Sequence, residues 1–193
     1  MPTKKILTPI EPGYTYHIYN RGNNYQNTFF SDEDYQLFLG RFKFYMKGSC
    51  LLYAFVLLPN HYHLLLRVHD GEPGLQFSHQ YSKFILSYTN KLNFKLKRNG
   101  SFFLARFRRI RVESEDYLRR LIYYIHHNPV KHNVFDDYKN YPYSSYRIFK
   151  SNQPTSLGRE QALDFFGGIN DFNEYHQYLL GQDVIRKLIL EED

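Results

Sequence analysis

Two apolar runs separated by a Pro-Asn pair constrain this chain more than any other feature. Residues 51–58 read LLYAFVLL, which is long enough for a strand buried on both faces and too short for a typical helix. Pro59 and Asn60 interrupt the run, and residues 61–68 (HYHLLLRV) continue as a second β-forming segment. The pattern predicts a β-hairpin.

Three segments around this hairpin have clear preferences of their own. β-Forming residues at 14–21 run into a Gly-Asn-Asn turn and predict a first strand. Apolar residues at helical spacing predict a helix over 32–47, where Ser31 and Asp34 match a capping box. The same spacing predicts a longer helix over 75–96.

The remaining core segments complete the order of elements. Residues 101–112 are extended in character, and Ser114 followed by two carboxylates begins a further helix. We expect that helix to run to about Asn128, where Pro129 kinks or ends it. The order β-α-β-β-α-β-α predicts an α+β fold with a ferredoxin-like core, in which helices cover one face of an antiparallel sheet.

Length and composition limit the class of protein. The 193 residues suffice for one domain, expected over 1–150, followed by a linker and short helical extension over 151–193. The one cysteine excludes an internal disulfide framework and any multi-cysteine metal site. No apolar run approaches the roughly 20 residues of a membrane-spanning helix. Residues 1–13 lack the apolar stretch of a signal peptide, so we expect a cytoplasmic protein without a membrane partner.

The first candidate site is the His61-Tyr62-His63 segment. Successive side chains of a strand point to opposite faces, so the two imidazoles share a face and the tyrosine takes the other. Two neutral imidazoles side by side can chelate a divalent cation. The alternative interpretation is a pair of hydrogen-bonded or surface histidines. A metal would need a third ligand from elsewhere in the chain.

The last core helix offers that ligand. Tyr124 and Asn128 are an i, i+4 pair and lie on one flank of its apolar stripe, with Arg120 one turn earlier. His127 points away from the core and His126 lies on the opposite flank. A phenol, an amide oxygen and a guanidinium thus line one edge of the helix, although core packing is the plainer interpretation of Tyr124. The stripe itself consists of Leu118, Leu121, Ile122 and Ile125.

A basic and aromatic stretch between 95 and 111 is the third feature. It contains no acidic residue in a chain of net charge +6, and three phenylalanines interleave with its cations. Cations bind phosphates and aromatic rings stack on bases, so the stretch is either a nucleic-acid-binding surface or a merely solvated charged face. The expected contacts are Arg21 together with Lys95, Lys97, Arg98, Arg106, Arg108, Arg109, Arg111 and Arg120.

These segments together resemble the HUH single-tyrosine transposases, which include insertion-sequence transposases and REP-associated tyrosine transposases. The resemblance covers about residues 14–147 and rests on four motifs. They are YHIYNRGNN at 16–24, LLPNHYHLLLRV at 57–68, FFLARFRRIRVESEDYL at 102–118 and YYIHHNPVKHNVF at 123–135. One departure is Leu104-Ala105, where many members carry Gln with Gly or Arg, so DNA contacts there are expected to differ.

The resemblance implies a metal-dependent strand transferase that acts on single-stranded, hairpin-forming DNA. His61 and His63 match the two metal-binding histidines, and Asn128 matches the side-chain amide that completes the site for Mg²⁺ or Mn²⁺. Tyr124 matches the nucleophile, which would form a 5′-phosphotyrosine and release a 3′-OH. The helix over 114–128 would thus be the nucleophile helix. A homodimer is kept as one possible assembly.

Two other classes stay open at this point. A domesticated DNA-binding module would keep the fold and the basic face without chemistry, although all three motif positions are retained. An RNA-binding ferredoxin-like domain would need aromatic platforms on its sheet, and no RNP-type motif is present.

Overall fold

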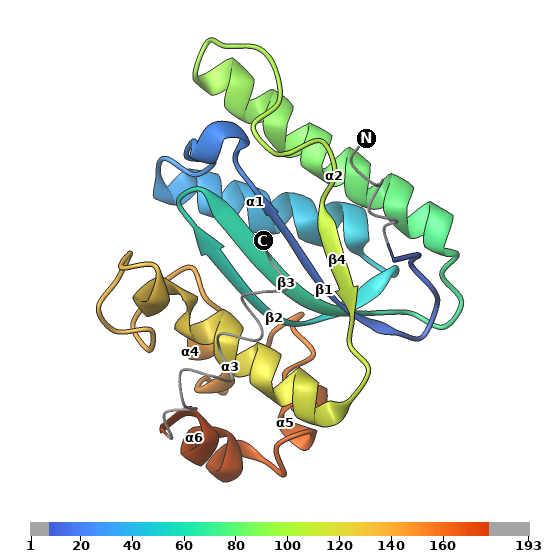
Figure 1. Ribbon diagram of the computed structural model, residues 1–193, viewed down its shortest axis with the longest axis vertical. Coiled ribbons are helices and arrows are strands. Elements are labelled where there is room, and N and C mark those ends of the chain that lie inside the picture. The colour runs from blue at the N-terminus through green and yellow to red at the C-terminus, as the bar shows by residue number, and fades with distance from the viewer. Residues whose placement is uncertain (1–7, 178–193) are drawn as a thin grey trace, which may run out of the picture.

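The computed structural model describes residues 8–177 and has an α+β architecture (Figure 1). The strands are β1 (Thr15–Arg21), β2 (Cys50–Leu58), β3 (His61–Val68) and β4 (Arg108–Arg111). The longer helices are α1 (Asp32–Met46), α2 (Gly74–Lys95) and α3 (Glu115–Lys131). Shorter helices are the 3-10 turn η1 (Asn23–Tyr25), α4 (Tyr146–Phe149), α5 (Arg159–Asp164) and α6 (Ile169–Gln177).

The strands form one antiparallel sheet in the order β2-β3-β1-β4. β2 and β3 make the hairpin expected from the two apolar runs, with Leu58 paired to His61 across the turn. Helix α1 connects β1 to β2, and α2 connects β3 to β4. As a result, β1 and β4 lie on the side of β3 opposite to β2. This is the ferredoxin-like order, and the predicted fold class is confirmed.

The sheet separates two layers of helices. Side-chain alternation along β3 turns Tyr62 toward α1 and α2. The ring centroids of Tyr62 and Phe38 are 4.9 Å apart, and the hydroxyl oxygens of Tyr62 and Tyr81 are 2.9 Å apart. His63 points to the opposite face and meets Tyr124 of α3, with ring centroids 5.7 Å apart. In Figure 1, α1 passes behind the strands while α3 lies next to β2. The candidate metal and nucleophile residues therefore meet between the sheet and α3.

Helix α3 continues past the point at which we expected it to end. It runs through Pro129 to Lys131, and the prediction of an end near Asn128 is wrong. Proline removes one backbone donor from the last turn only, and the buried ring adds to the apolar face of the helix. His132 N still donates to the carbonyl of Asn128 at 3.0 Å, and Val134 N to that of Pro129 at 2.9 Å. The helix is thus long enough to bring Lys131 to the site.

The segment predicted to be extended over 101–112 joins the sheet only near its C-terminal end. Only Arg108–Arg111 forms a strand, whereas Phe103 makes an isolated bridge with Gly22. Phe102 and Phe103 are buried in the core rather than exposed for stacking. Because these rings anchor the loop, the chain reaches the edge of the sheet only after it has passed beside η1.

The segment after α3 packs onto that helix. Among its side chains, Leu163, Phe166 and Phe172 belong to the same hydrophobic core as the sheet. The boundary near 150 stays a prediction, and its part over 178–193 lies outside the described residues. Across residues 8–177, the helices are too short or too polar to cross a bilayer.

Candidate active site

The two histidines of the HYH segment lie side by side on one face of the sheet. Their ring centroids are 5.3 Å apart and the rings are nearly perpendicular, at 86°. Cross-strand pairing places Tyr19 opposite His63 and Arg21 opposite His61. Since directly paired residues of antiparallel strands share a face, all four side chains belong to the layer that α3 covers.

Burial keeps both imidazoles neutral. Removal from water lowers the pKa of His61 to about 3 and that of His63 well below its usual value of 6.5. The positive charge of Lys131 lowers both pKa values further, whereas the Asn128 side chain raises that of His61. Neutral imidazole is the form that binds metal ions, so the environment holds both residues ready as ligands.

Two acceptor atoms at this place have no donor. His61 Nδ1 lies 2.6 Å from the Asn60 amide oxygen, so Nδ1 carries the hydrogen and Nε2 keeps a lone pair. The Asn128 amide nitrogen donates to the Tyr124 carbonyl oxygen at 2.9 Å. Both His61 Nε2 and Asn128 Oδ1 are buried and accept no hydrogen bond within residues 8–177. Unpaired buried acceptors are costly, and a bound cation would satisfy both of them.

The donor set therefore fits a divalent metal ion. In the described part of the chain, no group of three or more His, Cys, Asp and Glu side chains could hold one. A metal bound beside His61 and His63 would thus take the amide oxygen of Asn128 as its third ligand. Imidazole suits transition metals and a neutral oxygen suits Mg²⁺ or Mn²⁺, so this donor set is compatible with a divalent ion of either kind.

Tyr124 reaches from α3 to the histidines and is almost completely buried, with 1% of its surface exposed. Its ring packs edge-on against His63 and against His17, at centroid distances of 5.7 and 6.4 Å. Lys131 donates a hydrogen bond to the Tyr124 hydroxyl at 2.9 Å and lies 4.5 Å from the ring centroid. An ammonium group in this place stabilises negative charge on the phenol oxygen.

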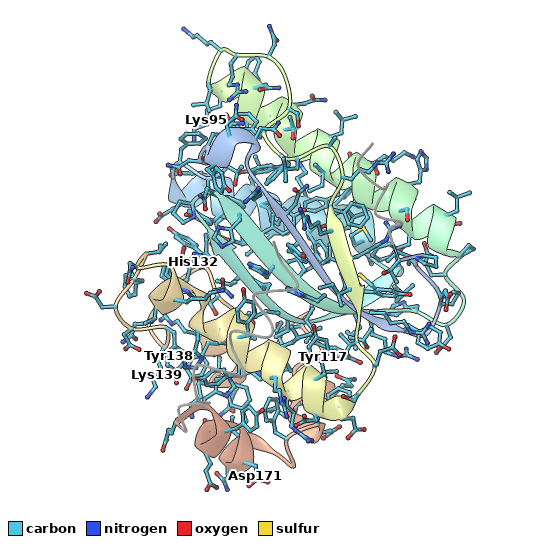
Figure 2. The ribbon with its side chains drawn as sticks, viewed as in Figure 1. Lys95, Tyr117, His132, Tyr138, Lys139 and Asp171 are labelled. Atoms are coloured by element: carbon cyan, nitrogen blue, oxygen red, sulfur yellow. The ribbon has the colours of Figure 1, made fainter. Side chains whose placement is uncertain are left out.

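Three residues that the sequence analysis missed complete the site: His17, Lys131 and His132. The His132 ring lies 4.7 Å from that of His61, and Figure 2 shows it at the C-terminal end of α3. Alternation along β1 puts His17 on the same face as Tyr19, a signal that becomes useful only when the pairing with β3 is known. Lys131 and His132 lie beyond the expected end of the helix, so no local pattern marked them.

His17 orients His63. Its Nε2 lies 3.0 Å from His63 Nδ1, and both side chains are buried. One of these nitrogens carries the shared hydrogen; when His63 donates, its Nε2 keeps the lone pair that a metal needs. His17 is thus a hydrogen-bond partner that fixes the ring orientation of His63, one of the proposed metal ligands.

We expect His17→Ala to weaken Mn²⁺ binding by about 10- to 100-fold. The measurement is titration calorimetry of the full chain with Mn²⁺, at a temperature where both proteins are folded. In His17→Gln the amide oxygen accepts the same hydrogen, so this variant should recover most of the affinity. Equal Mn²⁺ affinity of the wild type and His17→Ala would contradict the orienting role.

An open cavity of about 460 Å³ adjoins these residues. His61, His63 and Lys131 line it, whereas Tyr124 lies behind them and does not. At the rim, Tyr25 is 65% exposed, and the guanidinium of Arg21 lies 4.3 Å from the centroid of its ring. The cavity is large enough for a nucleotide-sized ligand.

Strand alternation divides the arginines of β4. Arg108 is paired with Tyr19 and lines the cavity, while Arg109 and Arg111 face the other side of the sheet. Of the predicted DNA-binding residues, Arg21 and Arg108 are the two that line the cavity beside the histidines.

Most of the predicted cations that do not line the cavity pair with groups of the chain itself. Lys95, at the C-terminal end of α2 in Figure 2, bonds at 2.6 Å to Asp34, a buried carboxylate that caps α1. Arg98 donates to Gln26 at 2.9 Å. The remaining pairs are Arg109 with the Thr8 carbonyl, Arg111 with Glu11 and Glu113, and Arg120 with Asp116. Lys97 and Arg106 are exposed. The basic residues are thus dispersed over several faces.

The structure buries the two adjacent histidines of α3, His126 and His127, more than the sequence analysis predicted. His127 does not point away from packed structure: its ring stacks on Tyr123 at 3.8 Å and on Tyr138 at 3.7 Å. His126 is fully buried and bonds to His176 of α6 at 3.0 Å. The segment after α3 covers both rings, which local periodicity could not show.

Comparison with known proteins adds a fold relative. No family model and no curated protein matches the chain. Among solved structures, a REP-associated tyrosine transposase bound to a REP hairpin matches with a TM-score of 0.65 and 19% identity. The match covers 79% of this chain and 88% of that chain. This chain has a tyrosine-transposase fold. The predicted resemblance is confirmed at the level of the fold, and in that fold α3 holds the residue expected to act as nucleophile.

Proposed function

We propose that this chain is a metal-dependent endonuclease and strand transferase of single-stranded DNA, in which Tyr124 is the nucleophile. The observation that carries the proposal is the convergence of the Tyr124 hydroxyl, an ammonium group and two neutral imidazoles beside an unpaired amide oxygen. The fold relative is a tyrosine transposase bound to a REP hairpin, which supports DNA as the substrate class.

The proposed reaction exchanges one phosphoester for another. The Tyr124 oxygen forms a bond to phosphorus as the bond to the 3′ oxygen breaks, and the released oxygen takes a proton to become a 3′-OH. The phenol proton leaves to solvent. Lys131 stabilises the phenol oxygen as it loses that proton, and again when it departs in the reverse or transfer step. Because a phosphoester is retained throughout, the exchange needs no ATP.

His61, His63 and Asn128 would hold the metal ion beside this reaction centre. When bound, a divalent ion supplies Lewis-acid stabilisation of the phosphate and of the leaving oxygen. The Lys131 ammonium covers the hydroxyl of Tyr124, so an incoming phosphate shares this cation as it approaches. Arg108, at the wall of the cavity, would hold a neighbouring phosphate.

The experiment that tests the proposal is adduct formation. The full chain is incubated with labelled hairpin DNA that carries single-stranded tails, with Mn²⁺ or with a chelator, and resolved under denaturing conditions. We expect a covalent protein–DNA band and a shortened DNA fragment only with Mn²⁺. Binding of the hairpin without any adduct would favour a DNA-binding module that does no chemistry.

The two arginines of the cavity should carry part of the electrostatic binding. We expect the double variant Arg21→Gln with Arg108→Gln to flatten the log–log salt dependence of single-strand affinity by about 1.4, roughly 0.7 for each lost phosphate contact. Arg120→Gln is the matched control, because Arg120 does not line the cavity. Fluorescence anisotropy at several salt concentrations measures the slopes. If Arg120→Gln flattens the salt dependence as much as the double variant does, the phosphate contacts are not made in the cavity.

A further inference from the structure

A second groove lies between α2 and the loop that leads to β4. Its volume is about 500 Å³, and neutral polar side chains make up much of its lining. Figure 1 shows this loop running alongside α2. The polar lining consists chiefly of Ser82, Thr89, Asn90, Asn93 and Asn99.

Helical spacing gathers these groups into a stripe. Ser82, Thr89 and Asn93 follow one another at intervals of seven and four residues, and Asn90 adjoins them. The side chain of Asn93 donates to the Gly100 carbonyl at 2.9 Å and so holds the loop over the helix. Its Oδ1 is buried and accepts no hydrogen bond within residues 8–177. One amide oxygen of the groove lining is thus left without a hydrogen-bond partner in the described part of the chain.

The groove adjoins the candidate active site. Asn20 and Leu104 line both cavities, and the Asn20 side chain donates to the Leu104 carbonyl at 3.1 Å. This contact joins β1 to the loop and forms a wall common to the two spaces. The two cavities are therefore neighbours, so a strand held in the first would need to cross only Leu104 to reach the second.

The charge around the groove suits a polyanion. Neither α2 nor the stretch from 95 to 111 contains an acidic residue. Lys97 and Arg106 are exposed on this loop, and Ile85 and Phe107 give the groove an apolar floor. The cations at the margin suit phosphates, and the apolar floor suits the faces of bases. The amides on the wall suit the edges of bases.

We propose that this groove reads the nucleobases of the DNA strand that continues from the candidate active site. The inference rests on the proposed function and adds sequence discrimination to it. Asparagine amides both donate and accept, so they can pair with the donor and acceptor edge of an unpaired base, as they do with adenine. Asn90 and Asn99 are exposed and available for such contacts.

The test separates bases from phosphates. Affinity is measured by fluorescence anisotropy with chelator present, in a Tyr124→Phe background that prevents cleavage. The probes are one hairpin with tails of different sequence and the same hairpin with an abasic tail, which keeps the phosphates. The variants are Asn90→Ala and Asn99→Ala, and Asn152→Ala on an exposed turn is the matched control.

We expect the reference protein to discriminate between tails by about 5- to 100-fold, and Asn90→Ala or Asn99→Ala to reduce this discrimination to about twofold. The salt dependence should not change, because no charge is removed, and on the abasic tail all proteins should bind alike. If both variants discriminate as well as Asn152→Ala does, the groove assignment is wrong while the proposed function stands. If the reference protein does not bind single-stranded tails, both proposals fail.

Discussion

We expect Tyr124→Phe to abolish the covalent DNA adduct and to lower the cleavage rate by at least about 10³-fold, because a phenyl ring offers no nucleophile. The substitution removes one oxygen from a ring that stays packed against His17 and His63. Hairpin affinity and the melting temperature should therefore change little. The adduct is scored on a denaturing gel with labelled DNA and Mn²⁺.

The neighbouring tyrosine is the matched control. Tyr123 is also buried, but its ring stacks on His127 and lies near His176, away from the proposed metal ligands. Tyr123→Phe should leave cleavage largely intact, and a chelator should stop cleavage by the wild type. Cleavage at the wild-type rate by Tyr124→Phe would mean that water or another tyrosine attacks the phosphate.

The second large effect is acid unfolding driven by buried neutral histidines. Burial lowers the pKa of His17 and His176 to about 3 and that of His127 to about 4, and it places that of His126 well below 6.5. The unfolded chain therefore binds more protons than the folded one below pH 6.5. Stability is complete above that pH and falls as the pH is lowered toward the folded-state pKa values.

The expected size is large enough to unfold the protein. Well below pH 6.5, each such histidine lowers the free energy of unfolding by about 1.4 kcal/mol per pH unit, so even two that titrate independently lower it by about 5 kcal/mol between pH 6.5 and 4.5. That loss is comparable with the roughly 5–15 kcal/mol by which domains are stable. We expect urea unfolding monitored by circular dichroism to show a steep loss of stability over this interval.

Burial lowers the pKa values of the His126 network, and its hydrogen bonds are complete while the rings are neutral. His176 Nδ1 bonds to the Phe172 carbonyl at 2.8 Å and so carries a hydrogen, which leaves its Nε2 to accept from His126. His126 Nε2 lies 2.8 Å from the Ser145 hydroxyl oxygen, which also bonds to the Phe55 carbonyl at 3.2 Å. Each ring nitrogen therefore has a partner without either ring carrying a charge.

His176→Gln tests this account. The variant should take up about one proton fewer on unfolding, because its amide can accept from His126 without titrating. His79→Gln, on the exposed surface of α2, controls for the loss of one histidine. A wild-type stability that stays constant between pH 7 and 5 would show that these imidazoles do not resist protonation.

The sequence alone determined the elements and much of the candidate site. Strand alternation placed His61 and His63 on one face of the sheet. Helical periodicity placed Tyr124 beside Asn128, one turn further along the helix. The apolar runs on either side of Pro59 predicted the hairpin for the same reason. These signals are local, so they can be read without knowing what packs against them.

Only the tertiary structure decided which distant residues join the site and which leave it. His17 meets His63 because β1 pairs with β3 in one register, and a shift of one residue would turn it to the other face. Lys131 reaches Tyr124 because burial keeps α3 helical through Pro129. Arg108 and Arg109, adjacent in sequence, face opposite sides of the sheet because side chains alternate along β4. Register, burial and the choice of partner depend on contacts between segments far apart in the chain, and no local pattern encodes them.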